Sequence, residues 1–165
     1  MDRVHGNNAP HGQGAARAQS HRPYLRLLLS LGVSYAVMFA VMFARVNTLD
    51  NVYASLNQAW MAGLMVAPML LIMLATMRSM FHSAALNIAL AVAGVALIAL
   101  FWGLIRTQGG IGDTQFLRSM ISHHAGAILV CERASLSDER VRRLCGQIIE
   151  SQQREIAEMK QLLDR

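Results

Sequence analysis

The sequence predicts an all-α protein in which three transmembrane helices precede an αα-hairpin outside the membrane. The chain of 165 residues is 54% hydrophobic and 15% charged, whereas a soluble domain averages about 25% charged residues. Its apolar residues gather in three long, almost uncharged segments at 27–44, 58–77 and 84–105. Each segment is close to the ~20 residues that a helix needs to cross a bilayer. The last third instead places apolar residues at helical spacing among charged ones, which predicts amphipathic helices.

Residues 1–23 precede the first apolar segment and are rich in Gly, Asn, Gln, Ala and His. They show no apolar period, and this composition predicts a disordered tail. The apolar segment that follows is longer than the core of a signal peptide, which has about 7–15 residues, and no A-x-A cleavage site comes after it. We therefore expect an uncleaved membrane helix.

The membrane region is expected at residues 24–106, with helices at about 25–44, 58–77 and 84–105. Loops on the cytoplasmic side of a membrane carry an excess of Lys and Arg. Four arginines precede or open the first span and Arg78 follows the second, while Arg45 and Arg106 flank the spans on the other side. We therefore expect the lipid bilayer as a partner, a cytoplasmic N-terminus and an extracytoplasmic C-terminal domain. In a Gram-negative bacterium this domain faces the periplasm from the inner membrane.

Methionines recur at every fourth residue of the second span and form a slanted ridge, which consists of Met61, Met65, Met69, Met73 and Met77. Methionine is a flexible filler between packed helices, and its thioether is also a ligand for Cu(I). We expect packing, because no Cys or His accompanies the ridge within the bilayer. A soft-ligand track for copper is the alternative.

A glycine-rich linker at 107–112 leads into the predicted hairpin at 113–165. Asp113 is placed to cap a first helix that runs to about residue 134. A serine-containing turn follows, and the second helix runs to about residue 163. Two such helices cannot bury much apolar surface alone. We expect an antiparallel homodimer that completes a four-helix bundle, with packing on the membrane helices as the alternative.

The first hairpin helix carries Met120, His123 and His124 within five residues, and Met120 lies one helical turn from His124. Thioether sulfur combined with imidazole nitrogen suits copper, and Cu(I) especially. In an antiparallel hairpin these side chains face three residues of the second helix, namely Gln152, Glu155 and Met159. The pattern therefore predicts a copper ion held by His nitrogens and Met sulfurs, with Gln152 or Glu155 orienting an imidazole. The alternative is a polar network that fixes the register of the hairpin.

The two cysteines, Cys131 and Cys145, have no CxxC spacing. A disulfide, two metal ligands or two small core residues are all compatible with this pattern. Cys131 lies about 10 Å along the helix from His124, which is too far for a nucleophile and its base.

Other classes of function are disfavoured by missing motifs. The sequence lacks the Glu-x-x-His pairs of di-iron bundles and the His-Glu-x-x-His motif of zinc proteases. Residues 113–165 hold eight basic and eight acidic side chains, so the surplus positive charge lies beside the spans. A nucleic-acid-binding module would concentrate that charge on its soluble part. We expect neither an enzyme nor a nucleic-acid-binding protein.

The C-terminal third resembles the bacterial family named domain of unknown function 305, over about residues 110–165. The first half of the shared pattern is Asp113, Phe116, Leu117, Met120, Ile121, His123, His124, Ala127 and Ile128. The second half is Ile148, Ile149, Ser151, Gln152, Glu155, Ile156 and Met159. The three preceding spans are similar to those of a membrane-anchored subgroup of this family.

This resemblance implies a ferritin-like helical bundle outside the cytoplasm, and in some members copper bound by Met and His. It implies Met120, His123, His124 and Met159 as ligands. It also implies three supporting positions, which are Asp113, Gln152 and Glu155. Copper-binding members often have Met at the position of Val130 and Pro at that of Ser122, and a Cys131 thiolate can replace the missing Met.

The expected function is that of a membrane-anchored, extracytoplasmic protein that sequesters or hands over copper without catalysis. The alternative is a structural or signalling module whose hairpin dimerises or docks on a membrane partner without metal.

Overall fold

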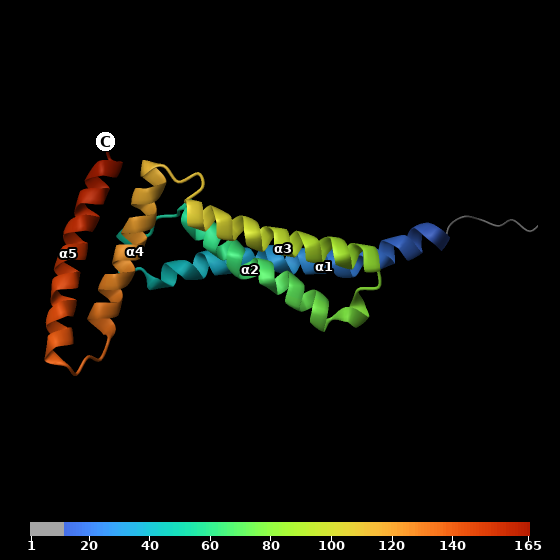
Figure 1. Ribbon diagram of the computed structural model, residues 1–165, viewed down its shortest axis with the longest axis horizontal. Coiled ribbons are helices and arrows are strands. Elements are labelled where there is room, and N and C mark those ends of the chain that lie inside the picture. The colour runs from blue at the N-terminus through green and yellow to red at the C-terminus, as the bar shows by residue number, and fades with distance from the viewer. Residues whose placement is uncertain (1–11) are drawn as a thin grey trace, which may run out of the picture.

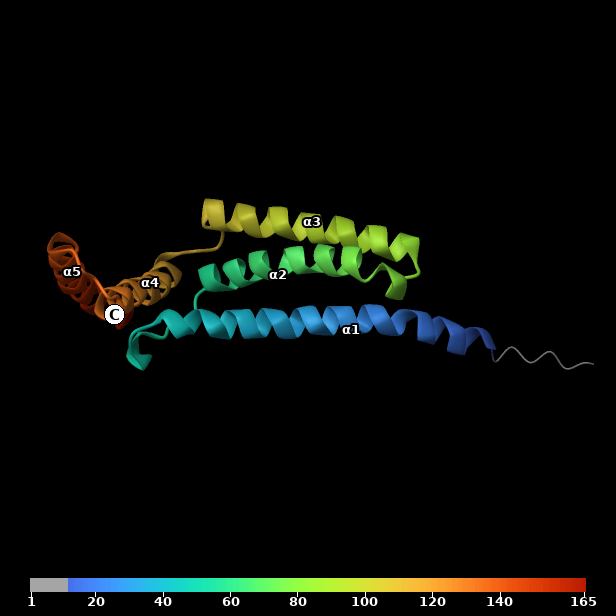
Figure 2. The ribbon, with the colours of Figure 1, turned by 90° about the horizontal axis from the view of Figure 1, so that it is seen from below.

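The computed structural model describes residues 12–165, and the side chains from residue 22 onward. Over this range it has no β-strand, three short 3-10 helices and five α-helices, which are α1 (Gly12–Val41), α2 (Leu56–Thr76), α3 (Ala84–Thr107), α4 (Asp113–Arg133) and α5 (Glu139–Leu163). Helices α1, α2 and α3 run side by side along the long axis, and α4 and α5 cross one end of this bundle (Figures 1 and 2). The predicted all-α class is confirmed.

Three helices are long and apolar enough to cross a membrane, and their apolar segments are Arg22–Arg45, Leu56–Thr76 and Ala84–Thr107. Ser55 opens α2 with a capping box, in which its side chain and that of Gln58 each accept from the other's backbone. The α2–α3 contact is close at Gly63, where an added Cβ would lie 2.5 Å from the ring of Phe101. Most apolar side chains of α1 and α3 point outward, as a lipid environment requires.

Helix α1 begins earlier than the sequence indicates. The predicted disordered tail was residues 1–23, yet residues 12–23 already belong to α1, and residues 1–11 lie outside the described part of the chain. The segment before Pro23 is rich in Ala, Arg and Gln, which favour a helix. Helical propensity therefore outweighs polar composition at this position.

A connecting segment between α1 and α2, residues 46–55, lies against the hairpin and is called the docking loop here. The Ser122 hydroxyl of α4 accepts from the backbone N–H of Tyr53 at 3.4 Å and lies 3.2 Å from the carbonyl oxygens of Asn51 and Tyr53. Two helical turns before Ser122, the side chain of Gln115 accepts from the backbone N–H of Leu56 at 2.9 Å. Polar contacts therefore hold α4 on the end of the α1–α3 bundle.

The hairpin core contains Ile121, Ala125 and Ile128 of α4 with Ile156 and Met159 of α5. Two apolar residues of the docking loop, Val46 and Tyr53, pack against this core. The hairpin thus buries part of its apolar surface on its own chain, which was the alternative to dimerisation. The homodimer stays a prediction, since a single chain does not test it.

Candidate metal site in the hairpin

Helix α4 turns His124 toward α5, where only 7% of the residue is exposed. Its Nδ1 lies 2.8 Å from the backbone carbonyl oxygen of Met120, and its Nε2 lies 2.6 Å from Oε2 of Glu155. Carbonyl and carboxylate oxygens are both acceptors, so the ring lies between two acceptor oxygens and bridges the backbone of α4 to the carboxylate of α5.

Glu155 is the α5 partner in this pair, and about half of its side chain is exposed. Its second oxygen, Oε1, accepts from the Ser151 hydroxyl at 3.0 Å. The hydrogen bond from His124, followed by the one from Ser151, lowers the pKa of Glu155 below its ordinary range. The carboxylate is therefore ionised at neutral pH.

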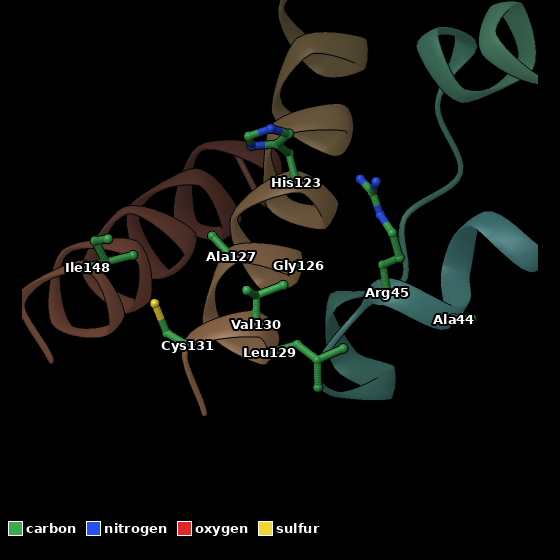
Figure 3. Close-up of a pocket in the computed structure, with 9 residues that line it drawn as sticks. All are labelled: Ala44, Arg45, His123, Gly126, Ala127, Leu129, Val130, Cys131 and Ile148. Carbon is green, nitrogen blue, oxygen red and sulfur yellow. The ribbon is translucent and has the colours of Figure 1, made fainter. Parts of the chain in front are cut away.

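His123 points away from this pair and is exposed. The ring centroids of His123 and His124 are 6.0 Å apart, with an angle of 67° between the ring planes. His123 instead lines a cavity of about 500 Å³ at the junction with the first span, together with Arg45 and the α4 residues Gly126 and Val130 (Figure 3). The structure therefore assigns the two adjacent histidines to different surroundings.

The two predicted thioether ligands lie in the hairpin core. Met159 of α5 is 9% exposed within this core, and Met120 packs against the same cluster. Met120, His124 and Met159 are thus gathered at the α4–α5 interface, while His123 is not part of this group. Gln152 is half-buried on α5, one turn before Glu155.

Two predicted roles need correction. Asp113 is the first residue of α4, and the capping position is Gly112, so Asp113 contributes only negative charge to the first turn. Cys131 forms a disulfide with Cys145, and their Cα atoms are 5.3 Å apart. A disulfide sulfur is not a thiolate, so Cys131 cannot replace the methionine missing at Val130.

The donor chemistry of the site is soft. Among the residues whose side chains are described, no three or more His, Cys, Asp and Glu residues gather as a metal-binding group. If the hairpin holds a metal, methionine sulfur is the additional donor at this interface, and a His124–Met120–Met159 set suits Cu(I). The bond from Nδ1–H to the Met120 carbonyl resembles the second hydrogen bond that orients most metal-bound imidazoles. Glu155 occupies the direction in which Nε2 would face the metal.

Sequence reasoning missed the cavity beside His123 and the contacts of the docking loop. The cavity joins Arg45, at the end of the first span, to a helix about eighty residues later in the chain. The one local indication of this junction in the sequence is Arg45 itself, an arginine at the end of the first apolar segment on the side of the hairpin.

Comparison with known proteins supports the resemblance and extends it. The family described as Domain of unknown function (DUF305) matches residues 75–163, so the match includes α3 as well as the hairpin. The chain is 34% identical over 120 residues to "Uncharacterized protein L153" of Acanthamoeba polyphaga mimivirus, and the alignment covers 72% of this chain and 77% of the viral protein. No solved structure matches the chain.

Proposed function

The chain belongs to the family named domain of unknown function 305, and we propose that it is a membrane-anchored protein that sequesters or transfers copper without catalysing a reaction. The observation that carries this proposal is the gathering of Met120, His124 and Met159 between α4 and α5. Two thioethers and one imidazole on facing helices form a ligand set suited to Cu(I).

Copper binding at this site requires an exchange of partners at His124. The metal would take Nε2, and the Glu155 carboxylate would move away. The bond from Nδ1 to the carbonyl of Met120 would stay and hold the ring in place. Copper would therefore compete with Glu155 for Nε2.

We place the hairpin outside the cytoplasm, in a bacterium on the periplasmic side of the inner membrane. The Cys131–Cys145 disulfide supports this side, because disulfides persist in oxidising compartments. The arginine bias around the spans supports the same orientation.

We also propose a ferritin-like four-helix bundle made by two copies of the hairpin. Large apolar side chains remain exposed on α5, and they include Val141 at 41%, Leu144 at 54% and Leu162 at 44%. A second hairpin packed on this face would remove their surface from water.

A second candidate function is a structural or signalling module that works without metal. It is favoured by the two hydrogen bonds of His124, which occupy both ring nitrogens inside the hairpin. A partly buried polar pair of this kind can fix the register of two helices.

Cu(I) titration of the full chain in detergent, against a competing chelator, separates the two functions. Met120→Leu combined with Met159→Leu keeps the volume of the core nearly constant and removes both sulfurs. We expect this variant to lose at least tenfold in Cu(I) affinity with unchanged helix content.

The matched control is Met65→Leu with Met69→Leu in the ridge of α2, which should bind copper like the parent protein. Equal binding by the parent and the hairpin variant, or no Cu(I) binding by the parent, would overturn the proposal and favour the module without metal. Loss of copper in the control alone would move the site to the methionine ridge.

A further inference from the structure

The corner between the end of the first span and α4 has the features of a ligand site that copper binding does not use. Its larger cavity, about 500 Å³, is bordered by Arg45 and His123 and has an apolar wall that includes Ala44, Leu129 and Val130. Figure 3 shows Arg45 extending from the end of the first span toward the helical turn that carries His123, with Gly126 and Val130 on the following turns of α4.

A smaller cavity of about 60 Å³ shares Arg45 and His123 with the first, and its other side is polar. Ser119 and Ser122 contribute hydroxyl groups there, and Asn57 donates to Ser119 at 3.2 Å. The Asn57 Oδ1 atom is buried and accepts no hydrogen bond from any residue that the structure describes. Arg45 and His123 therefore stand between an apolar groove and a polar pocket.

The charge of this corner favours an anion. No Asp or Glu lines either cavity, and none of the four ion pairs found among the described side chains involves Arg45. A guanidinium without a carboxylate partner is well suited to a phosphate group. A headgroup that carries its own ammonium would find no carboxylate here.

The position of the corner points to a lipid as the source of that phosphate. Arg45 is the last residue of the first apolar segment, and the turn end of the hairpin projects sideways beyond α1–α3 (Figure 1). The headgroup of a lipid beside the first span would therefore lie between Arg45 and the C-terminal half of α4. Trp60, near the start of α2, and Trp102, near the end of α3, lie at this same end of the bundle, as expected at a membrane interface.

We propose that this corner binds one anionic phospholipid from the leaflet on the side of the hairpin. The phosphate contacts Arg45 and His123, and the glycerol end of the acyl chains lies against Ala44, Leu129 and Val130. A hydroxyl group of the headgroup can donate to Asn57 Oδ1. This lipid ties the hairpin to the membrane surface, and the proposal does not rest on copper binding.

Native mass spectrometry of the full chain in detergent tests the proposal, with dioleoylphosphatidylglycerol and dioleoylphosphatidylcholine as probes. The parent protein should retain one phosphatidylglycerol under conditions that remove phosphatidylcholine. Arg45→Gln should weaken this retention at least tenfold. The matched control is Arg106→Gln, because Arg106 closes the third span at the same end and lies over Trp102 at 6.0 Å.

A second variant keeps the test valid if Arg45→Gln unfolds. Val130 is 66% exposed, so Val130→Glu introduces a repelling carboxylate into the groove without disturbing the core. Its control is Gln153→Glu, which adds the same charge at an exposed position of α5. Retention that is equal for both lipids, or equally reduced in test and control variants, would indicate general lipid association and overturn the proposal. Displacement of phosphatidylglycerol by millimolar inorganic phosphate would overturn it as well, since the corner would then be a site for free anions.

Discussion

Two adjacent histidines of α4 differ in every property that decides a chemical role. His124 is buried, has acceptor oxygens beside both ring nitrogens and faces Glu155, whereas His123 is exposed and borders a cavity with Arg45. Neighbours on a helix point about 100° apart, so one core cannot take both rings. The His124 ring therefore lies at the α4–α5 interface, and the His123 ring lies at the junction between α4 and the end of the first apolar segment.

Glu155→Gln should lower the stability of the hairpin at neutral pH and flatten its dependence on pH. Because the folded state lowers the pKa of Glu155, the carboxylate stabilises the fold above about pH 4.3, the ordinary value of a glutamate. This contribution disappears as pH falls through the lowered folded pKa. Thermal unfolding of both proteins between pH 7 and pH 3 measures the effect, and their difference should close in acid.

The control for this measurement is Glu158→Gln, which removes an exposed carboxylate from the same helix. Parallel pH profiles for Glu155→Gln and the parent would show that the pair with His124 contributes nothing to stability.

At the scale of single elements, the disulfide closes the turn end of the hairpin. Cys131 and Cys145 are 14 residues apart in the sequence, and closing a loop of this size stabilises a fold by about 3 kcal/mol. Cys131→Ser with Cys145→Ser should therefore lower the unfolding temperature of the hairpin, as should a reductant on the parent protein.

The same double variant should keep the parent's Cu(I) affinity, because neither cysteine is a free thiolate. Its unfolding temperature should not respond to reductant, which controls for unspecific effects of the reagent. A loss of copper together with the cysteines would contradict the assignment of soft ligands to Met120 and Met159.

The contact between α2 and α3 depends on the missing side chain of Gly63. A Cβ at this position would meet the Phe101 ring at 2.5 Å, so Gly63→Ala should destabilise the bundle by about 1–3 kcal/mol through overpacking. Gly103→Ala is the control, since no atom lies within 4 Å of its added Cβ, and it should gain about 0.5–1 kcal/mol of helix stability. Thermal unfolding in detergent compares the two variants, and equal effects would refute the close contact.

For the whole molecule, the sequence predicts what depends on local chemistry. The three long, almost uncharged segments predict the three apolar helices. The spacing of Met120 and His124 places both residues on the face of α4 that meets α5. The surroundings of His123 could not be predicted, because they depend on where the end of the first apolar segment meets α4. The disulfide stayed one of three alternatives for the same reason, since only the packing of α5 on α4 brings Cys145 to Cys131.

The docking loop is the largest feature that local patterns do not reveal. Asn51 and Tyr53 are polar or amphipathic residues in a connecting segment, and their partner Ser122 is about seventy residues later. No periodicity links such segments. The contacts of this loop nevertheless decide whether the hairpin is free or is fixed on the α1–α3 bundle.

Ser122→Ala tests this coupling, because it removes a hydroxyl that is 9% exposed and leaves the backbone N–H of Tyr53 without its acceptor. A buried polar group that loses its partner costs about 1–3 kcal/mol. The hairpin keeps its own core and disulfide, so the cost should appear as local opening of the junction. Hydrogen exchange of residues 46–55 should accelerate by about tenfold or more, at 1.4 kcal/mol per factor of ten, while exchange in α5 stays unchanged. The control is Ser135→Ala in the exposed turn, which should alter hydrogen exchange in neither segment. Unchanged exchange at residues 46–55 in Ser122→Ala would mean that apolar packing alone holds the hairpin on the α1–α3 bundle.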